Sequence, residues 1–337
     1  MKKQRFTSKQ GIMMLILMSV LILLLVIVSI NSGKMNLSVF EVFQVIIGKG
    51  TQKQNLIVFE FRLPRIILAI LVGVGMGASG CIMQSLLRND MASPGTLGIS
   101  SGSGLFVLVF VLMFASKGIS SAVALPLLAF IGGLTAAALI FLLSYRKGNE
   151  ISPTGLILTG VALSSGYGAI TTLLTLKLDQ NQMDFMQRWS AGSLWGSEWK
   201  YIMILAPWTL ILLIYVIYKS RVLNALHLGN QTATGLGVAV KSEFLGLSIA
   251  AVALSSGSVA LGGNFFFVGM ISPHMARKLV GPNHKLLLPA SCLAGAILIL
   301  LADTITRTIS LGTDVPTGIV ITVLSTPYFL YLLSKSN

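Results

Sequence analysis

The sequence predicts an all-α membrane protein in which about ten transmembrane helices form one domain over residues 1–337. Hydrophobic residues make up 54% of the chain and charged residues only 10%, and the mean hydropathy is +0.86. This composition excludes an ordinary soluble domain. Four uncharged segments are long enough to cross a hydrocarbon core of roughly 30 Å, which takes about 20 residues. These segments are Ile12–Ile30, Thr96–Ser116, Ile119–Ser144 and Ile151–Leu176.

The remaining spans are less sharply bounded in the sequence. Further apolar segments begin near Ile66, Tyr201, Phe244, Leu286 and Val315. The stretch Phe244–Ala276 has no full charge, is too long for one span and is barely long enough for two. Gly262-Gly263-Asn264 is its only obvious turn, so we expect two short spans on either side of it.

The distribution of basic residues predicts the orientation of the chain. With both termini in the cytoplasm, 14 of the 24 lysines and arginines face inward, which the positive-inside rule favours. Anionic lipid of the inner leaflet then accounts for the net charge of +14, and no nucleic-acid partner is expected. The inward residues are Lys2, Lys3, Arg5, Lys9, Arg88, Arg146, Lys147, Lys219, Arg221, Lys241, Arg277, Lys278, Lys285 and Lys335.

No motif of a catalytic or energy-releasing site occurs in the sequence. It contains no phosphate-binding loop, no H-E-x-x-H and no G-x-S-x-G. The two cysteines and three histidines lack metal-ligand spacing, so we expect no metal site and no bound cofactor. A secondary transporter would need embedded ionisable groups and an inverted repeat, and a membrane enzyme would need converging polar residues. Asp303 is the only plausible embedded charge.

Three polar features stand out from the apolar background. Arg62 and Arg65 flank a proline turn at the predicted outer mouth of a span, where arginines either anchor to lipid headgroups or bind a partner's carboxylate. The interval Ser220–Glu243 is the longest polar interval on the inner side, and ordered loops of this length are often contact sites. Ser164-Ser165-Gly166-Tyr167 supplies hydroxyls that either line a wet passage or bond to the preceding helical turn.

The motifs taken together resemble the iron-siderophore and vitamin B12 uptake permeases, the membrane subunits of type II ABC importers. The resemblance runs from about Arg62 to Leu333. Its specific motifs are R-L-P-R at 62–65, A-S-G-x-x-M-Q at 78–84, R-N at 88–89, G-V-A-L at 160–163, W-x-x-G-S-L at 189–194, F-V-G-M-x-x-P-H-x-x-R at 267–277, L-P-A-S at 288–291, A-D-x-x-x-R at 302–307, P-x-G-I-V at 316–320 and P-x-F from Pro327.

The resemblance implies a ten-helix subunit that pairs with a second permease, either a copy or a relative, around a central passage. Two ATP-binding subunits would dock inside and use the ATP, and a substrate-binding protein would dock outside. Arg62, Arg65 and Arg307 fall where the family places arginines that receive glutamates of the binding protein. The cytoplasmic loop at about 220–243 falls where the family has its coupling helices. Its candidate contact residues are Leu226, Leu228, Gly229, Asn230, Thr234, Leu236 and Gly237.

Several positions depart from the family pattern. Asn89-Asp90-Met91-Ala92 replaces the usual N-P-L-A of the inner turn. Asn230 and Thr234 stand where the family commonly has a glutamate and a basic residue, Asp314-Val315-Pro316 replaces a version with glutamate, and Ser325 replaces a glycine. These changes leave the expected fold intact, and they fit a heterodimer whose partner permease carries the more typical loop.

The expected function is that of a permease subunit in a bacterial cytoplasmic membrane that imports ferric siderophore, with iron-hydroxamate as the preferred subclass. Haem, catecholate and cobalamin import remain alternatives within the family, and an ion-coupled secondary transporter is the alternative outside it. Ser164, Ser165, Gly166 and Tyr167 are the candidate residues of the translocation pathway.

Overall fold

The computed structural model describes residues 8–33, 37–113, 121–144, 153–308 and 315–335, and all regular structure in these ranges is helical. The helices, in chain order, are α1 (Ser8–Asn31), α2 (Val39–Ile46), α3 (Gln52–Asn55), the π-helix η1 (Leu56–Arg62), α4 (Leu63–Leu87), α5 (Ile99–Met113), α6 (Ser121–Ser144), α7 (Pro153–Thr175), α8 (Gln180–Ser190), α9 (Trp199–Tyr218), α10 (Ser220–His227), α11 (Asn230–Gly235), α12 (Val240–Gly262), α13 (Val268–Val280), α14 (His284–Thr308) and α15 (Thr317–Lys335).

Ten of these helices correspond to the predicted spans. Among the described residues, seven helices are long and apolar enough to cross a membrane: α1, α4 with the helices that precede it, α6, α7, α9, α12 and α14. Helices α5 and α15 are also apolar but shorter. The tenth is α13, a 13-residue helix packed against α14 and α4. The predicted segment ends Ser116, Ile119 and Ile151 lie outside the described residues, as does Asp314.

The stretch Phe244–Ala276 forms one long helix and one short one, which corrects the expectation of two short spans. Helix α12 begins at Val240 and runs for 23 residues, enough for a full span. The predicted break is confirmed, because Gly263 follows α12 with φ of +79°, a conformation that favours glycine. Only α13, beyond this break, is short.

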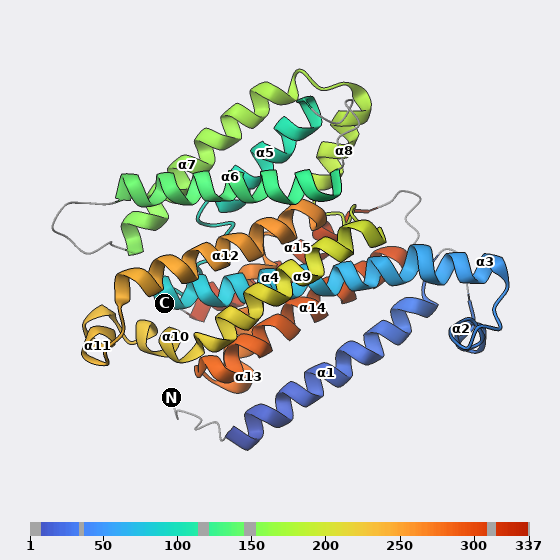
Figure 1. Cartoon of the computed structure of the whole chain (residues 1–337), viewed down its shortest axis with the longest axis horizontal. Helices are drawn as coiled ribbons and strands as arrows, with labels where there is room; N and C mark the ends of the chain where they lie inside the picture. The colour runs from blue at the N-terminus through green and yellow to red at the C-terminus, as the bar shows by residue number, and fades with distance from the viewer. Residues whose placement is uncertain (1–7, 34–36, 114–120, 145–152, 309–314, 336–337) are drawn as a thin grey trace.

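Helices α4, α12 and α14 form the centre of the bundle, with α1 along one side and α5, α6 and α7 along the other (Figure 1). Small residues let the central backbones approach closely. A Cβ added to Gly73 would lie 2.4 Å from the carbonyl oxygen of Gly295, and one added to Gly80 would lie 1.7 Å from that of Gly269. Close backbone contact of this kind is a main source of helix association in lipid. Gly73 therefore lets α4 pack directly against α14.

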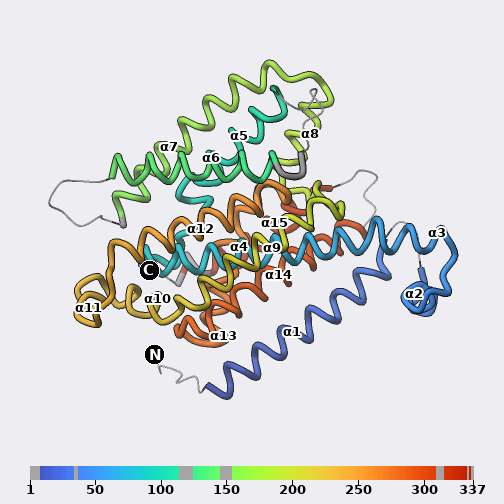
Figure 2. Tube along the Cα trace, in the orientation of Figure 1, coloured from blue at the N-terminus to red at the C-terminus, as the bar shows by residue number. Residues whose placement is uncertain are grey.

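The bundle carries different short helices at its two ends. In Figure 1, α2 and α3 lie at one end of the long axis, and α10 and α11 lie at the other. The trace in Figure 2 shows α1 beginning, and α15 ending, at the end that carries α10 and α11. The start of the first helix and the end of the last helix therefore lie at the same end of the bundle as the predicted coupling loop.

Candidate functional site

The predicted outer arginines lie at the junction of η1, α4 and α14. Arg62 is the last residue of η1, and Arg65 lies in the first turn of α4. Pro64 occupies that first turn, directly after η1, and the helices from Gln52 to Leu87 run on as one apolar span. Arg307 lies in the last turn of α14, 242 positions after Arg65 in the sequence, and the fold brings both to one cluster.

One buried carboxylate organises this cluster. Asp303 is fully buried, and its Oδ1 accepts a hydrogen bond from Nε of Arg65 at 2.9 Å. Its other oxygen, Oδ2, accepts from Nε of Arg307, also at 2.9 Å. The hydroxyl of Thr317 donates to Oδ1 at 3.3 Å. A buried charge is tolerated when it is paired and hydrogen-bonded in this way, so Asp303 joins α4, α14 and α15.

Two of the arginines also hold the end of α1. The guanidinium of Arg62 donates to the carbonyl oxygen of Ile30, and that of Arg307 donates to the hydroxyl and carbonyl oxygens of Ser29. Ser29 and Ile30 lie in the last turn of α1, whose carbonyls have no partner within the helix. Cationic side chains are favoured at such a terminus. Arg62 is accordingly only 6% exposed.

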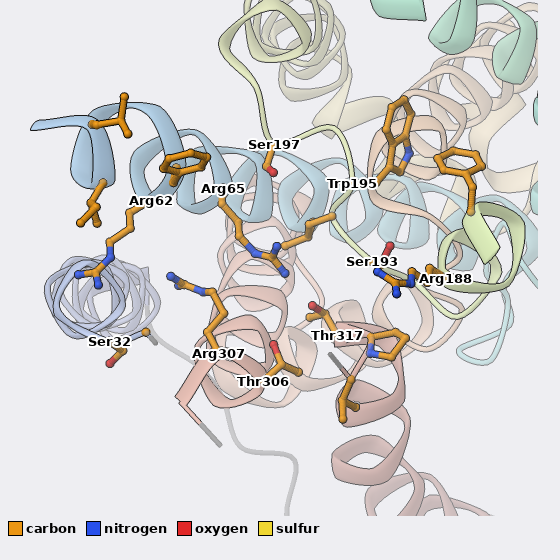
Figure 3. A pocket seen from close by; sticks show the side chains of 18 of the residues that line it. Ser32, Arg62, Arg65, Arg188, Ser193, Trp195, Ser197, Thr306, Arg307 and Thr317 are labelled. Atoms are coloured by element: carbon orange, nitrogen blue, oxygen red, sulfur yellow. The ribbon is translucent and has the colours of Figure 1, made fainter. Parts of the chain in front are cut away.

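Above these residues lies a pocket of about 880 Å³. Figure 3 shows Arg62 and Arg307 reaching toward one side of the pocket, whereas Arg65 and Arg188 extend toward its centre from opposite walls. We call this cavity the outer arginine pocket, after the side on which the sequence predicts its arginines. Its lining residues are Ser32, Gly33, Lys53, Leu56, Ile57, Phe61, Arg62, Arg65, Asp184, Phe185, Arg188, Ser193, Leu194, Trp195, Ser197, Thr306, Arg307, Val315, Pro316 and Thr317.

Three residues of this site were missed as site members by reasoning from the sequence. The i, i+4 spacing of Asp303 and Arg307 on one helix could have indicated their ion pair. The contact of Ser29 with Arg307 spans 278 positions and has no local signal. Arg188 precedes a recognised motif, but its place in the pocket depends on how α8 folds back toward α4.

At the opposite end, the predicted coupling loop forms two short helices, α10 and α11. Gly229 separates them with φ of +114°, and Gly237 follows α11 with φ of +80°. Both conformations favour glycine, which explains these residue types. Leu228 and Leu236 are 66% and 65% exposed, so each presents an apolar side chain to the surface.

The other predicted coupling residues divide between the core and the surface. Leu226 is buried in the core, and Asn230 begins α11. The Thr234 hydroxyl donates to the carbonyl oxygen of Asn230 at 2.9 Å, which is a bond within α11. The exposed face of the loop therefore carries the two leucines among polar and small residues, with Gln231, Thr232, Thr234 and Gly237 exposed beside them and Gly229 buried.

Helix α10 is fastened to the bundle through His284, a residue that the sequence did not single out for coupling. The Oδ1 atom of Asn224 on α10 accepts from the backbone N–H of His284 at 2.9 Å, and it lies 2.7 Å from Nδ1 of the same residue. The proton of this ring contact must lie on Nδ1, because a carbonyl oxygen only accepts. Nε2 of His284 contacts the hydroxyl of Ser85 near the end of α4. His284 thus links α10 with α14 and α4.

A second set of contacts ties the turn after α4, which is predicted to lie on the inner side, to α13. Arg88, at the end of α4, has φ of +50°, which is uncommon for a residue with a side chain. Asp90 in the altered turn forms an ion pair with Arg277 of α13. Nearby, burial lowers the pKa of His227 on α10, so its imidazole stays neutral beside Arg88 and Arg277. Asp90 therefore supplies a charged link that the usual family turn would lack.

The predicted pathway residues lie on α7 and do not face one common direction. The hydroxyls of Ser164 and Ser165 donate back to the carbonyls of Gly160 and Val161, as serines commonly do inside a helix. Ser165 and Gly166 are exposed on the surface of the chain. Tyr167 is buried, and its hydroxyl lies 3.3 Å from that of Thr135 on α6.

The described residues contain no group of three or more His, Cys, Asp or Glu side chains that could hold a metal ion. Comparison with known proteins decides to which family the chain belongs. Residues 21–335 match the model of the FecCD transport family. The chain belongs to the FecCD transport family. The resemblance inferred from the motifs is confirmed, and the chain is a transport subunit of an ABC system, not an enzyme.

Curated FecCD relatives match the chain over nearly its whole length. The iron(3+)-hydroxamate import system permease protein FhuG of Bacillus subtilis (strain 168) is 44% identical, covering 96% of this chain and 98% of that protein. The iron-uptake system permease protein FeuC of the same organism is 36% identical and covers 94% of this chain and 96% of that protein. The hemin transport system permease protein HmuU of Yersinia pestis is 36% identical, with 96% of each chain covered.

A solved structure of a metal-chelate type ABC transporter in an inward-facing conformation has a similar fold. Its TM-score against this chain is 0.82 at 29% sequence identity, and the match covers 96% of this chain and 99% of that one. The predicted type II importer architecture, with its all-helical membrane bundle, is confirmed by this match.

Proposed function

We propose that this chain is the membrane-spanning permease subunit of an importer that carries a ferric siderophore into the cytoplasm, with iron-hydroxamate as the preferred cargo. The cargo assignment is supported by FhuG, whose 44% identity exceeds the 36% of FeuC and of the hemin permease HmuU. Haem or cobalamin remains the alternative cargo within the same family. An ion-coupled secondary transporter is disfavoured, because Asp303 is already paired with two arginines.

The two ends of the bundle differ in their surfaces, one cationic and one with exposed leucines, and we assign a different partner to each end. The outer arginine pocket docks an acidic surface of the extracytoplasmic binding protein through Arg62, Arg65 and Arg307. The exposed side of α10 and α11, with Leu228 and Leu236, seats in one of two ATP-binding subunits. ATP is bound and hydrolysed there, and this chain holds no cofactor. A second permease subunit, identical or related, completes the passage.

The chain is a single permease domain of a bacterial cytoplasmic membrane, and both of its termini face the cytoplasm. This orientation is supported by the excess of basic residues on the loop side and by the position of α10 and α11 at that same end. ATP binding would move α10, and His284 and Ser85 would pass that movement to α14 and α4. Ser164, Ser165, Gly166 and Tyr167 of α7 are proposed pathway residues. Ser165 and Gly166 are the two on its open face.

The observation that carries this proposal is the difference between the two ends of the bundle. The cationic pocket includes Lys53 of α3, and α3 lies at the end of the bundle opposite α10 and α11, beside which Leu228 and Leu236 are exposed (Figure 1). Uptake of a panel of labelled chelates by a deletion strain, complemented with this chain, tests it. Restored uptake of ferric hydroxamates, with little uptake of haem or cobalamin, is expected. Restored uptake of haem or cobalamin alone would reject the hydroxamate assignment.

A further inference from the structure

The outer arginine pocket has a strongly unbalanced charge. Its described lining contains five cationic side chains and one acidic side chain, Asp184. Beneath the lining, Asp303 offsets part of this charge through Arg65 and Arg307. A concave site lined by one sign of charge attracts groups of the opposite sign. The cationic residues are Lys53, Arg62, Arg65, Arg188 and Arg307.

The three family arginines are not equally available to a ligand in this pocket. Arg62 is nearly buried and bonded to α1, and the side chain of Arg307 is only 16% exposed. The side chain of Arg65 is 32% exposed, although its Nε is bonded to Asp303. Arg65 therefore offers the outer edge of its guanidinium to a ligand, whereas Arg62 and Arg307 offer less of theirs because they also hold α1 against the bundle.

Arg188 faces this wall from the other side of the pocket (Figure 3). Its side chain is exposed, and among the described residues it forms no hydrogen bond or ion pair. Arg188 is thus a cationic group of the pocket with its full hydrogen-bonding capacity available, since a guanidinium carries five N–H donors.

The wall that carries Arg188 is rigidly placed. Trp189, the next residue, is buried, and its indole N–H donates to the carbonyl oxygen of Ala260 at 3.3 Å. The side-chain amide of Gln182 donates to the carbonyl oxygen of Val111 at 3.2 Å, which fixes α8 against α5. Phe185 and Trp195 pack edge to face with centroids 5.3 Å apart. A charged group on a fixed helix loses little conformational entropy on binding.

The pocket has the character of a docking site and not of a passage. None of its described lining residues comes from α7, which carries the proposed pathway residues. Three of its lining residues, Arg65, Arg307 and Thr317, are bonded to the buried Asp303 beneath the lining. An occupant would therefore stay at the surface, as a loop of a docked protein does.

We propose that Arg188 is a further docking residue, and that Arg188 and Arg65 together receive a carboxylate-bearing loop of the extracytoplasmic binding protein. This inference rests on the proposed function. The loop carboxylate accepts hydrogen bonds from the two guanidinium groups on opposite walls, and the volume of about 880 Å³ admits the loop tip as well as its acidic side chain. Arg188 then contributes to the rate of docking as well as to its strength.

The test measures the rate and affinity with which the binding protein associates with the reconstituted transporter, at several salt concentrations. Arg188→Gln should lower the affinity about tenfold, the loss of one charge-assisted contact, and should flatten the salt dependence of the association rate. Arg188→Lys should retain the salt dependence and lose only part of the affinity, because Lys keeps the charge without the planar fork. Lys177→Gln is the matched control, since Lys177 is an exposed cation outside the pocket lining.

Arg65→Gln, measured in the same way, separates the two proposals. If Arg65→Gln weakens binding and Arg188→Gln matches the wild type, the role of Arg188 is rejected and docking at the pocket stands. If neither substitution changes the affinity, the docking proposal itself fails. An effect of Arg188→Gln on the concentration dependence of cargo uptake, with unchanged binding-protein affinity, would assign the pocket to the cargo and overturn the inference.

Discussion

The carboxylate of Asp303 accepts a hydrogen bond from Arg65 at 2.9 Å, joining two residues that are 238 positions apart in the sequence. The same carboxylate holds Arg307, so one buried group orients both arginines. Its charge also reduces the repulsion between the two guanidinium groups. Asp303 is therefore a positioning residue for the proposed docking surface.

We expect Asp303→Asn to weaken binding of the extracytoplasmic binding protein and to lower the thermal stability of the purified permease. The substitution preserves size but leaves two guanidinium groups without their shared anion, a change that costs about 3–5 kcal/mol when a buried pair is broken. Binding measurements and thermal unfolding of the same sample check both effects. Glu198→Gln is the control, because the exposed Glu198–Lys200 pair should contribute little. Wild-type affinity in Asp303→Asn would contradict the positioning role.

We expect Gly80→Ala to destabilise the bundle, whereas Gly166→Ala should be tolerated. A Cβ at Gly80 would lie 1.7 Å from the carbonyl oxygen of Gly269, which is backbone and cannot move aside alone. Overpacking of this kind typically costs about 1–3 kcal/mol, and contact with backbone places this site at the upper end. A Cβ at Gly166 meets no atom within 4 Å, and alanine favours a helix over glycine. Equal melting temperatures for the two variants would show that the α4–α13 contact is looser than described.

We expect His284→Ala to reduce uptake while the ATP-binding subunit stays bound. The substitution removes the ring contacts to Asn224 and Ser85, so α10 would move without carrying α4. Co-purification measures the complex, and uptake per ATP hydrolysed measures the coupling. Lys285→Gln, at the exposed neighbouring position, should behave as the wild type. Proportional loss of bound ATPase and of uptake would instead indicate a site of assembly.

Helix α2 should become less stable in acid. The backbone N–H of Ser38, followed by its hydroxyl, donates to Glu41 and lowers the pKa of that carboxyl below its ordinary value of 4.5. A lowered pKa in the folded state stabilises the helix above the unfolded value, and this contribution is lost as the pH falls through the folded value. The protection factors of the α2 amides, which correct for the intrinsic pH dependence of hydrogen exchange, should therefore fall below about pH 4.5. Glu41→Gln should abolish this pH dependence, and its persistence would exclude Glu41 as the cause.

The sequence predicted the helical membrane fold and the three family arginines because both have signals that can be found locally. Uncharged segments of about 20 residues mark spans, and R-L-P-R marks the start of α4. The long-range part of the network of ion pairs and hydrogen bonds was not predictable in this way. Its members Ser29, Arg65 and Asp303 lie far apart in the chain, and only the packing of α1, α4 and α14 brings them together.

The length of α12 was also misjudged, for a physical reason. Lys241 and Glu243 lie in its first turn and placed the predicted start at Phe244, but Glu243 pairs with Lys219 at 2.6 Å. Charges near a membrane surface can extend a helix past its apolar segment when they are paired or reach water. Hydropathy therefore locates the apolar segment of a span, but it does not locate the residue at which the helix begins.

The central claim, that the two ends of this chain serve two different partners, is tested most directly by crosslinking from each end in membranes that contain the whole transporter. Single cysteines at Ser197, on the outer arginine pocket, and at Leu236, beside α11, carry the crosslinker. The native Cys81 and Cys292 are buried and should stay unlabelled. We expect Ser197→Cys to capture only the binding protein and Leu236→Cys to capture only the ATP-binding subunit. Capture of the ATP-binding subunit from Ser197→Cys, or of the binding protein from Leu236→Cys, would contradict the account.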